Sequence, residues 1–232
     1  MRVKAVERAQ ARALRQEGWP HKRIAALLGV SPGSVHAWTR DIELTAEQRA
    51  HNLRGPAGPQ NPAVVARRAA SWSAACRAKR AAYQEEGRAR ARAGGDPLHL
   101  QGCMLYWAEG GKGRNVVDFA NSDLPMVRLF RGFLRDCLGV EDARLRIALN
   151  VYTNNGLSIA EIEAYWLDGL ALPRSVLRKH MIDHTPTSSS GRAKNRLIYG
   201  VCSLRLGSTH VLQHIYGAIQ EYAGFDEPRW LG

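Results

Sequence analysis

The stretch IAALLGVSPGSVHAWTR, residues 24–40, carries the clearest structural signal in this sequence. Before the central Gly29, Ile24 and Leu28 are apolar, and Ala25 is small at the point where a second helix would cross. After the glycine, apolar residues return at helical spacing. These residues are Val30, Val35 and Trp38. The pattern predicts two short helices that pack against each other across a tight turn at Gly29.

The boundaries of the second helix agree with this prediction. Ser31 can cap its N-terminus through the side-chain oxygen, and Pro32 takes the first helical position, where its missing N–H costs nothing. A further helix is predicted from about residue 3 to 17, ended by Gly18. Together the segments predict a three-helix domain of the helix-turn-helix type over residues 1–53. Domains of this type bind DNA.

The outward face of the second helix is the expected DNA-reading surface. Because Val35 and Trp38 face inward, the other side chains of this helix are left for the major groove. The DNA-binding candidates are Ser31, Gly33, Ser34, His36, Ala37 and Arg40. Only His36 and Arg40 among them are long. A three-helix bundle that binds another protein is the alternative, which the charge distribution disfavours.

Positive charge is concentrated in the N-terminal part of the chain. Residues 1–93 contain 18 Lys and Arg against 7 Asp and Glu, whereas residues 94–232 contain 15 against 14. Nearly all of the formal net charge of +12 therefore lies where DNA phosphates would need neutralising. A membrane-surface role would need apolar bulk opposite the basic face, and the apolar residues of this region are mostly alanine. The expected partner is double-stranded DNA, without membrane contact.

A linker and a basic helix are predicted over residues 54–95. Residues 54–62, RGPAGPQNP, would break a helix. Residues 63–93 are rich in alanine and arginine, which predicts a helix with a basic solvated face, ended by Gly94 and Gly95. Five side chains of this helix could contact DNA phosphates. They are Arg67, Arg68, Arg77, Lys79 and Arg80. A solvated spacer is the alternative.

Other features restrict the class of protein. The chain of 232 residues has no apolar run long enough to span a membrane and no signal-peptide pattern, so we expect a cytoplasmic, nucleoid-associated protein. The four cysteines lack paired spacing and are expected to be reduced thiols. Neither a phosphate loop nor a nucleophile elbow occurs, which argues against an ATPase or an acyl hydrolase.

Residues 96–232 predict a second domain of mixed α and β structure, so the fold class is α+β. Asn121, Ser122 and Asp123 are read as a helix cap, and Ser158 with Glu161 as a capping box. The predicted helices cover residues 98–109, 124–138, 158–170 and 209–223. The predicted strands cover residues 116–120, 145–152, 176–182 and 197–206, with a polar loop over 185–195.

The segment GCMLYWAEG, residues 102–110, with the strand, helix and further strands after it, resembles a divergent LAGLIDADG motif. In that family of homing endonucleases, the motif helices of two domains pack through small residues. The acidic residue before the final glycine holds a divalent metal over the scissile phosphates. Glu109 and Gly110 occupy these two places. The resemblance therefore implies a LAGLIDADG-like domain whose ligand is DNA, with contacts made through its sheet.

The pairing of a helix-turn-helix with such a domain also resembles bacterial and phage proteins that carry both modules. It is more distantly similar to the WhiA sporulation regulators, which have the two modules in the opposite order and a domain without nuclease activity. We therefore expect a sequence-specific DNA-binding protein, a transcriptional regulator with a catalytically degenerate LAGLIDADG-like domain and no cofactor.

A Mg-dependent homing-type DNA endonuclease is the alternative. Phosphodiester hydrolysis needs two acidic metal ligands and a basic group. Since this chain has one motif, the enzyme would be a homodimer with Glu109 of each subunit at the two-fold axis. Lys112, Lys194 and Arg196 are the candidate basic partners, the last two also as DNA contacts. A helix C-terminus disfavours an anion, so a metal or a basic residue is expected near Glu109.

Two histidine pairs have a spacing that can bind zinc from one helix face. They are His180 with His184 and His210 with His214, and Cys202 is a possible third ligand. Histidines near DNA or at the edge of a core are the more common meaning of such pairs, so no zinc site is expected.

Overall fold

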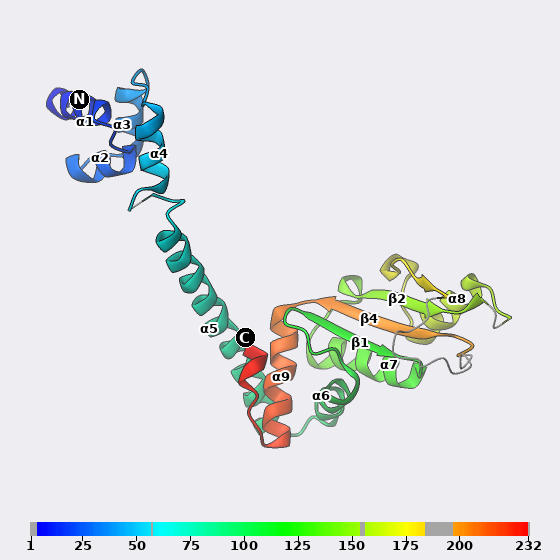
Figure 1. The fold of residues 1–232 in the computed structure, drawn as a ribbon. Coiled ribbons are helices and arrows are strands. Elements are labelled where there is room, and N and C mark those ends of the chain that lie inside the picture. The colour runs from blue at the N-terminus through cyan, green and yellow to red at the C-terminus, as the bar shows by residue number, and fades with distance from the viewer. Residues whose placement is uncertain (1–3, 57, 154–155, 184–196, 232) are drawn as a thin grey trace. The chain divides into compact units, whose positions relative to one another are not determined.

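A computed structural model describes residues 4–56, 58–153, 156–183 and 197–231. The fold is α+β, mostly helical, with one four-stranded sheet (Figure 1). It divides into two compact units, Met1–Ala75 and Cys76–Gly232. Within the described ranges, no helix is both long and apolar enough to cross a membrane.

The first unit contains the predicted helix-turn-helix. Its helices are α1 (Ala5–Gln16), α2 (His21–Leu28), α3 (Pro32–Thr39) and α4 (Ala46–Arg54). Gly29 ends α2 in the left-handed conformation (φ 62°), which glycine adopts without strain. Ser31 caps α3, its side chain accepting from the Ser34 N–H at 3.1 Å. A small core buries Ala11, Ile24, Ala25 and Val35, with Leu14, Trp19, Leu28, Val30 and Trp38 packed against it. The helix-turn-helix prediction is confirmed.

Helix α4 adds a fourth helix that the sequence analysis did not predict. It begins with a capping box, in which Thr45 and Gln48 bond each other's backbone N–H groups. The Gln48 side chain also donates to the carbonyl of Gln16 at 3.0 Å, and the Asn52 side chain to that of Gly18 at 2.8 Å. Polar side chains therefore hold α4 against the end of α1. Because these contacts are polar, the sequence of α4 has no apolar periodicity that would predict a helix.

The basic helix is α5 (Pro62–Ala93), as predicted. Its C-terminal part packs on α9 (Thr209–Ala223) within the second unit. A Cβ added to Gly87 would overlap the carbonyl of His214, and one added to Gly217 would overlap the carbonyl of Gln84. The two helix backbones therefore approach to a distance that only glycine permits at these positions.

The second unit is built around the sheet. Its other α-helices are α6 (Pro97–Glu109), α7 (Leu124–Gly132) and α8 (Ile159–Leu170). The strands are β1 (Val116–Asn121), β2 (Arg146–Val151), β3 (Met181–Ile182) and β4 (Val201–Gly207). The strand order is β1-β4-β2-β3; β4 is antiparallel to both neighbours, and β2 is parallel to β3. Alternate residues are buried against the helices, which leaves the opposite sheet face partly exposed.

Short helical turns complete the second unit. They are η1 (Phe133–Cys137), η2 (Asp142–Arg144), η4 (Arg174–Val176) and η5 (Pro228–Leu231). The predicted helix over residues 124–138 thus ends as the π-helical turn η1. The predicted caps are present: Asp123 accepts from the Met126 N–H, and Ser158 with Glu161 forms the capping box.

The predicted strand over residues 176–182 is wrong for most of its length. Residues Arg174–Val176 form the turn η4, Leu177 makes an isolated parallel bridge with Ile147, and Met181–Ile182 pair as β3. Between them the His180 Nδ1 accepts from the backbone N–H of Leu149 at 3.2 Å. A side chain takes the place of a strand backbone there, which strand propensity does not reveal. The predicted loop over residues 185–195 lies outside the described residues.

Candidate nucleic-acid interface

The outward face of α3 is open, as the sequence analysis predicted. Val35 and Thr39 are buried, and Trp38 is half-buried. The predicted DNA-contact residues are exposed or half-buried: Ser31, Gly33, Ser34, His36, Ala37 and Arg40. The Ser31 and Ser34 hydroxyl oxygens lie 2.9 Å apart. The outward face of α3 therefore presents the ordered hydroxyls of Ser31 and Ser34. Gly33 and Ala37 place no large side chain on this face.

His36 is oriented by a second histidine. Its ring meets that of His21 in α2 edge to face, with centroids 5.4 Å apart. The Thr39 hydroxyl donates to the Val35 carbonyl at 2.8 Å, so at 3.1 Å it must accept from Nε2–H of His21. Burial, together with the charges of Arg15 and His36, lowers the pKa of His21. A neutral His21 in one tautomer thus supports the His36 ring.

The C-terminal end of α3 is clamped by Arg12 of α1. Its guanidinium donates to the Trp38 carbonyl at 2.7 Å and to both carboxylate oxygens of Asp41 at 2.7 and 2.6 Å. The hydrogen bonds from Arg12 lower the pKa of Asp41 to about 2. Among the described residues, Arg40 has no hydrogen-bond or ion-pair partner, so its guanidinium is available to a ligand.

The basic residues of α5 fall into two groups. Arg67, Arg68, Arg77 and Lys79 are exposed and have no acidic partner among the described residues. The later cations are all engaged. Arg80 donates to the Leu231 carbonyl, Arg88 pairs with Asp226, Arg90 with Asp96, and Arg92 with Glu85 and Glu221. Of the five predicted phosphate contacts, Arg80 alone is held inside the protein.

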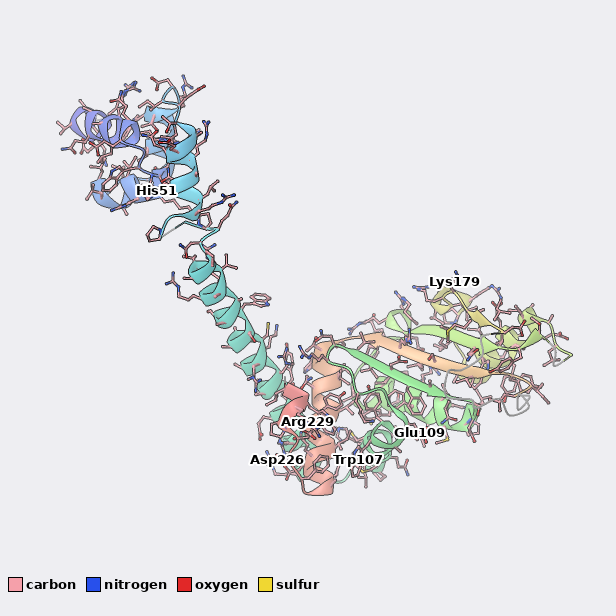
Figure 2. All side chains as sticks on the ribbon, in the orientation of Figure 1. His51, Trp107, Glu109, Lys179, Asp226 and Arg229 are labelled. Atoms are coloured by element: carbon pink, nitrogen blue, oxygen red, sulfur yellow. The ribbon has the colours of Figure 1, made fainter. Side chains whose placement is uncertain are left out.

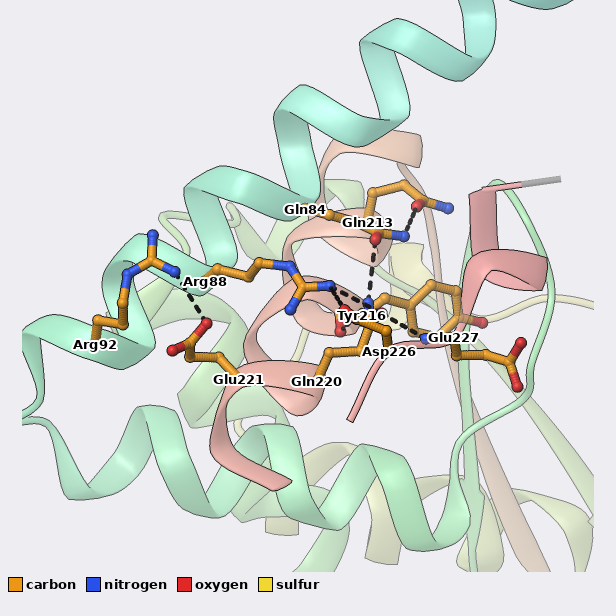
Figure 3. A network of polar contacts seen from close by, with 9 residues as sticks. All are labelled: Gln84, Arg88, Arg92, Gln213, Tyr216, Gln220, Glu221, Asp226 and Glu227. Carbon is orange, nitrogen blue, oxygen red and sulfur yellow. Dashed lines mark hydrogen bonds and ion pairs between the residues drawn. The ribbon is translucent and has the colours of Figure 1, made fainter. Parts of the chain in front are cut away.

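Three buried glutamines join α5 to α9 (Figure 3). Gln84 donates to Gln213 at 2.7 Å and accepts from Gln220 at 3.1 Å. Gln213 also donates to the carbonyl of Trp230, and Gln220 accepts from Arg88. Because each buried amide has a partner, the network stabilises the helix pair and carries no open binding position.

Residues 102–110, for which a LAGLIDADG motif was the expectation, are built into the second unit. A Cβ on Gly102 would overlap the ring of Phe133, so this small residue admits an aromatic ring of its own domain. Trp107, 42% exposed, stacks on Phe225 with ring centroids 5.5 Å apart. Glu109 lies exposed at the end of α6 (Figure 2).

Lys112 caps α6. Its ammonium donates to the carbonyls of Tyr106, Trp107 and Gly110 at 3.1, 2.8 and 2.6 Å. These three bonds use all three ammonium hydrogens. Burial lowers the pKa of Lys112. The positive charge also offsets Glu109 at the helix C-terminus, which is the basic compensation that the sequence analysis expected there.

A metal site is not assembled within the part of the chain that the structure describes, where no group of three His, Cys, Asp or Glu side chains could hold an ion. His180 binds Glu163, His210 binds Glu86, and the half-buried His214 binds the buried His99. Glu109 alone does not provide the ligands that Mg²⁺ needs. His184, Lys194 and Arg196 lie outside the described residues.

The exposed face of the sheet carries a charged row beside a row of small residues. Asp118, Arg205 and Arg146 are cross-strand neighbours, and Arg205 pairs with Asp118 at 2.9 Å. Next to them are Ala120, Ser203 and Ala148. Arg178 and Lys179 are exposed beyond the β2 side of the sheet. This face is accessible, partly basic and free of bulky side chains at its centre.

Comparison with known proteins identifies the first unit. A model of the homeodomain-like domain matches residues 2–48. The described residues of this range form a helix-turn-helix of the class that binds double-stranded DNA. The search of curated proteins found no match, and the search of solved structures found none.

Proposed function

We propose that this protein binds double-stranded DNA sequence-specifically and acts as a transcriptional regulator. The open face of α3 carries this proposal. His36 and Arg40 project from it, and contacts from His21 and Arg12 fix the helix beneath them. A helix held in this way can present side chains to base edges in the major groove with little loss of entropy on binding.

The unpaired cations of α5 support the same proposal. Arg67, Arg68, Arg77 and Lys79 can each neutralise a phosphate and release a counterion. The second unit, in keeping with its LAGLIDADG resemblance, would add contacts through the exposed sheet face. Among the described residues there, Lys179 has no hydrogen-bond or ion-pair partner, whereas Arg146 and Arg178 donate to backbone carbonyls and Arg205 is paired with Asp118.

Two observations favour a regulator over a homing-type endonuclease. Lys112 directs its three donors at backbone carbonyls, so none is left for a scissile phosphate without uncapping α6. Among the described residues, Glu109 belongs to no group of three His, Cys, Asp or Glu side chains that could hold a metal ion. An endonuclease would require a homodimer that brings two Glu109 side chains together, and we propose the degenerate, metal-free domain instead.

Selection of bound sequences from random double-stranded DNA, followed by incubation of the chosen site with protein, tests the proposal. We expect enrichment of a defined sequence in chelator and intact DNA after incubation in magnesium. Cleavage in magnesium that Glu109→Gln removes would establish the endonuclease. Absence of any enriched sequence would refute sequence-specific binding. Arg40→Ala should abolish enrichment of that sequence, and Arg49→Ala, which removes a charge from α4 and leaves α3 untouched, is the matched control.

A further inference from the structure

The first part of α5 is a helix without a packing partner. Every residue from 65 to 75 is exposed, and Trp72 is 73% exposed. Most of the stability of protein helices comes from tertiary packing, which this segment lacks, and exposed tryptophan side chains are unusual. Such a segment gains stability and buries its aromatic ring only when a ligand covers it.

The charge of this segment selects the ligand. No Asp or Glu occurs from residue 62 to 84. Arg67 and Arg68 are exposed and form no hydrogen bond or ion pair with the described residues. Self-association would bring these like charges together, which costs free energy. A membrane surface would need a broad apolar face, whereas Val65 and Trp72 are the only large apolar residues between 65 and 75. A polyanion is the partner that this composition fits.

We infer that residues 65–75 of α5 lie in a DNA major groove and read base edges through Arg67 and Arg68. This inference rests on the proposed DNA binding and adds a second reading element to α3. The major groove admits one α-helix, and an arginine fork bonds both acceptors of a guanine. The other residues of this segment, apart from Val65 and Trp72, are alanine and serine, so the helix backbone can approach the bases.

Trp72 adds a contact of a different kind. It lies one helical turn after Arg68, so both side chains share a face of the helix. A ring in this position would cover an apolar edge, and the thymine methyl group is the apolar feature of the major groove. The recognised DNA site is therefore longer than the α3 footprint, with guanine and thymine preferences in the added part.

The test separates base reading from phosphate contact. Arg67→Lys with Arg68→Lys keeps both charges and a similar helix propensity but removes the guanidinium forks. Sequence selection with the full chain should then show loss of the guanine preference in the outer part of the site, with about 10-fold weaker binding to the best site for each guanine contact. Affinity for random DNA and its salt dependence should not change. Arg90→Lys is the matched control on the same helix, because Arg90 is paired with Asp96, and it should leave every base preference intact.

Each other outcome is informative. If the double variant keeps the outer preference, the arginines contact phosphates only and the inference is wrong. If wild-type selection gives a short site with no outer preference, α5 does not read DNA, although the assignment of α3 stands. If wild-type protein selects no sequence at all, the proposed function itself fails. Circular dichroism of the variants verifies that the helix is retained.

Discussion

Arg12 binds the carboxylate of Asp41 through two parallel hydrogen bonds of 2.7 and 2.6 Å, and Asp41 directly follows Arg40 in the chain. The acid nearest to Arg40 is therefore already taken by a cation from α1. Had Asp41 been free, it would compete with DNA for the Arg40 guanidinium. The clamp thus fixes the end of α3 and keeps the neighbouring arginine available.

Arg40→Ala should weaken binding to the preferred DNA sequence more than binding to random DNA. A good base-edge contact is worth about 1 to 3 kcal/mol of discrimination. Titration of both DNA types under the same salt conditions measures the difference. Equal losses would mean that Arg40 contacts only phosphate. Arg49→Ala should lower both affinities slightly and equally.

Arg77→Gln with Lys79→Gln should flatten the dependence of log affinity on log salt concentration. Each phosphate contact contributes about 0.9 to the slope, so the double variant should lose about 2. Arg80→Gln should leave the slope unchanged and lower the thermal stability, because Arg80 serves the Leu231 carbonyl. Fluorescence anisotropy between low and moderate salt gives the slopes. A larger slope change for Arg80→Gln than for the double variant would contradict the division of α5.

Gly217→Ala should destabilise the second unit, since the added methyl group would overlap the Gln84 carbonyl. Overpacking of this kind costs about 1 to 3 kcal/mol. Gly207→Ala is the control, because nothing lies within 4 Å of a Cβ at that position. In denaturant unfolding, the midpoint of Gly217→Ala should lie clearly below that of Gly207→Ala. Similar midpoints would show that α5 and α9 separate at little cost.

Acid should destabilise the protein through His214. Burial, followed by the charge of the adjacent His99, lowers the pKa of His214 to about 4. The unfolded state, with a pKa near 6.5, then binds the proton first, so this stability is present above about pH 6.5 and is lost as the pH falls towards 4. The full loss is on the order of 3 kcal/mol. The measurement is the unfolding temperature of wild type and of His214→Gln between pH 7 and pH 4.5. The difference between the two proteins should shrink as the pH falls. Parallel curves of unfolding temperature against pH would exclude His214 as the cause.

Local sequence patterns predicted most of the helices and strands, but they did not predict which side chains contact one another. The helix-turn-helix follows from residues within one short stretch, where Gly29 and Ser31 each have a local role. The helix α4 was missed because its contacts are polar, although the pair Thr45 and Gln48 was a visible capping signal. For residues 176–182, only the end forms a strand, since His180 replaces backbone pairing with a ring nitrogen.

Contacts between residues far apart in the sequence determine which candidate site residues are free to bind a ligand. The charges of α5 are evident in the sequence, but Arg88 finds its partner Asp226 at a separation of 138 residues. The partner of Arg88 is not visible in the local sequence, because Asp226 lies near the C-terminal end of the chain. Likewise, the bond from Lys112 to Gly110 converts a candidate basic group into a helix cap. That role depends on the turn after α6, which sequence periodicity does not describe.

The three glutamines between α5 and α9 carry no charge at any ordinary pH, and salt does not screen the bonds between neutral amides as it screens phosphate contacts. A rise in ionic strength would therefore release the protein from DNA and weaken the ion pair between Arg92 and Glu221, while the amide hydrogen bonds between these helices keep their strength. Dissociation from DNA therefore depends on the salt concentration, whereas these amide hydrogen bonds do not. The protein can leave one DNA site while still folded and bind again at another site.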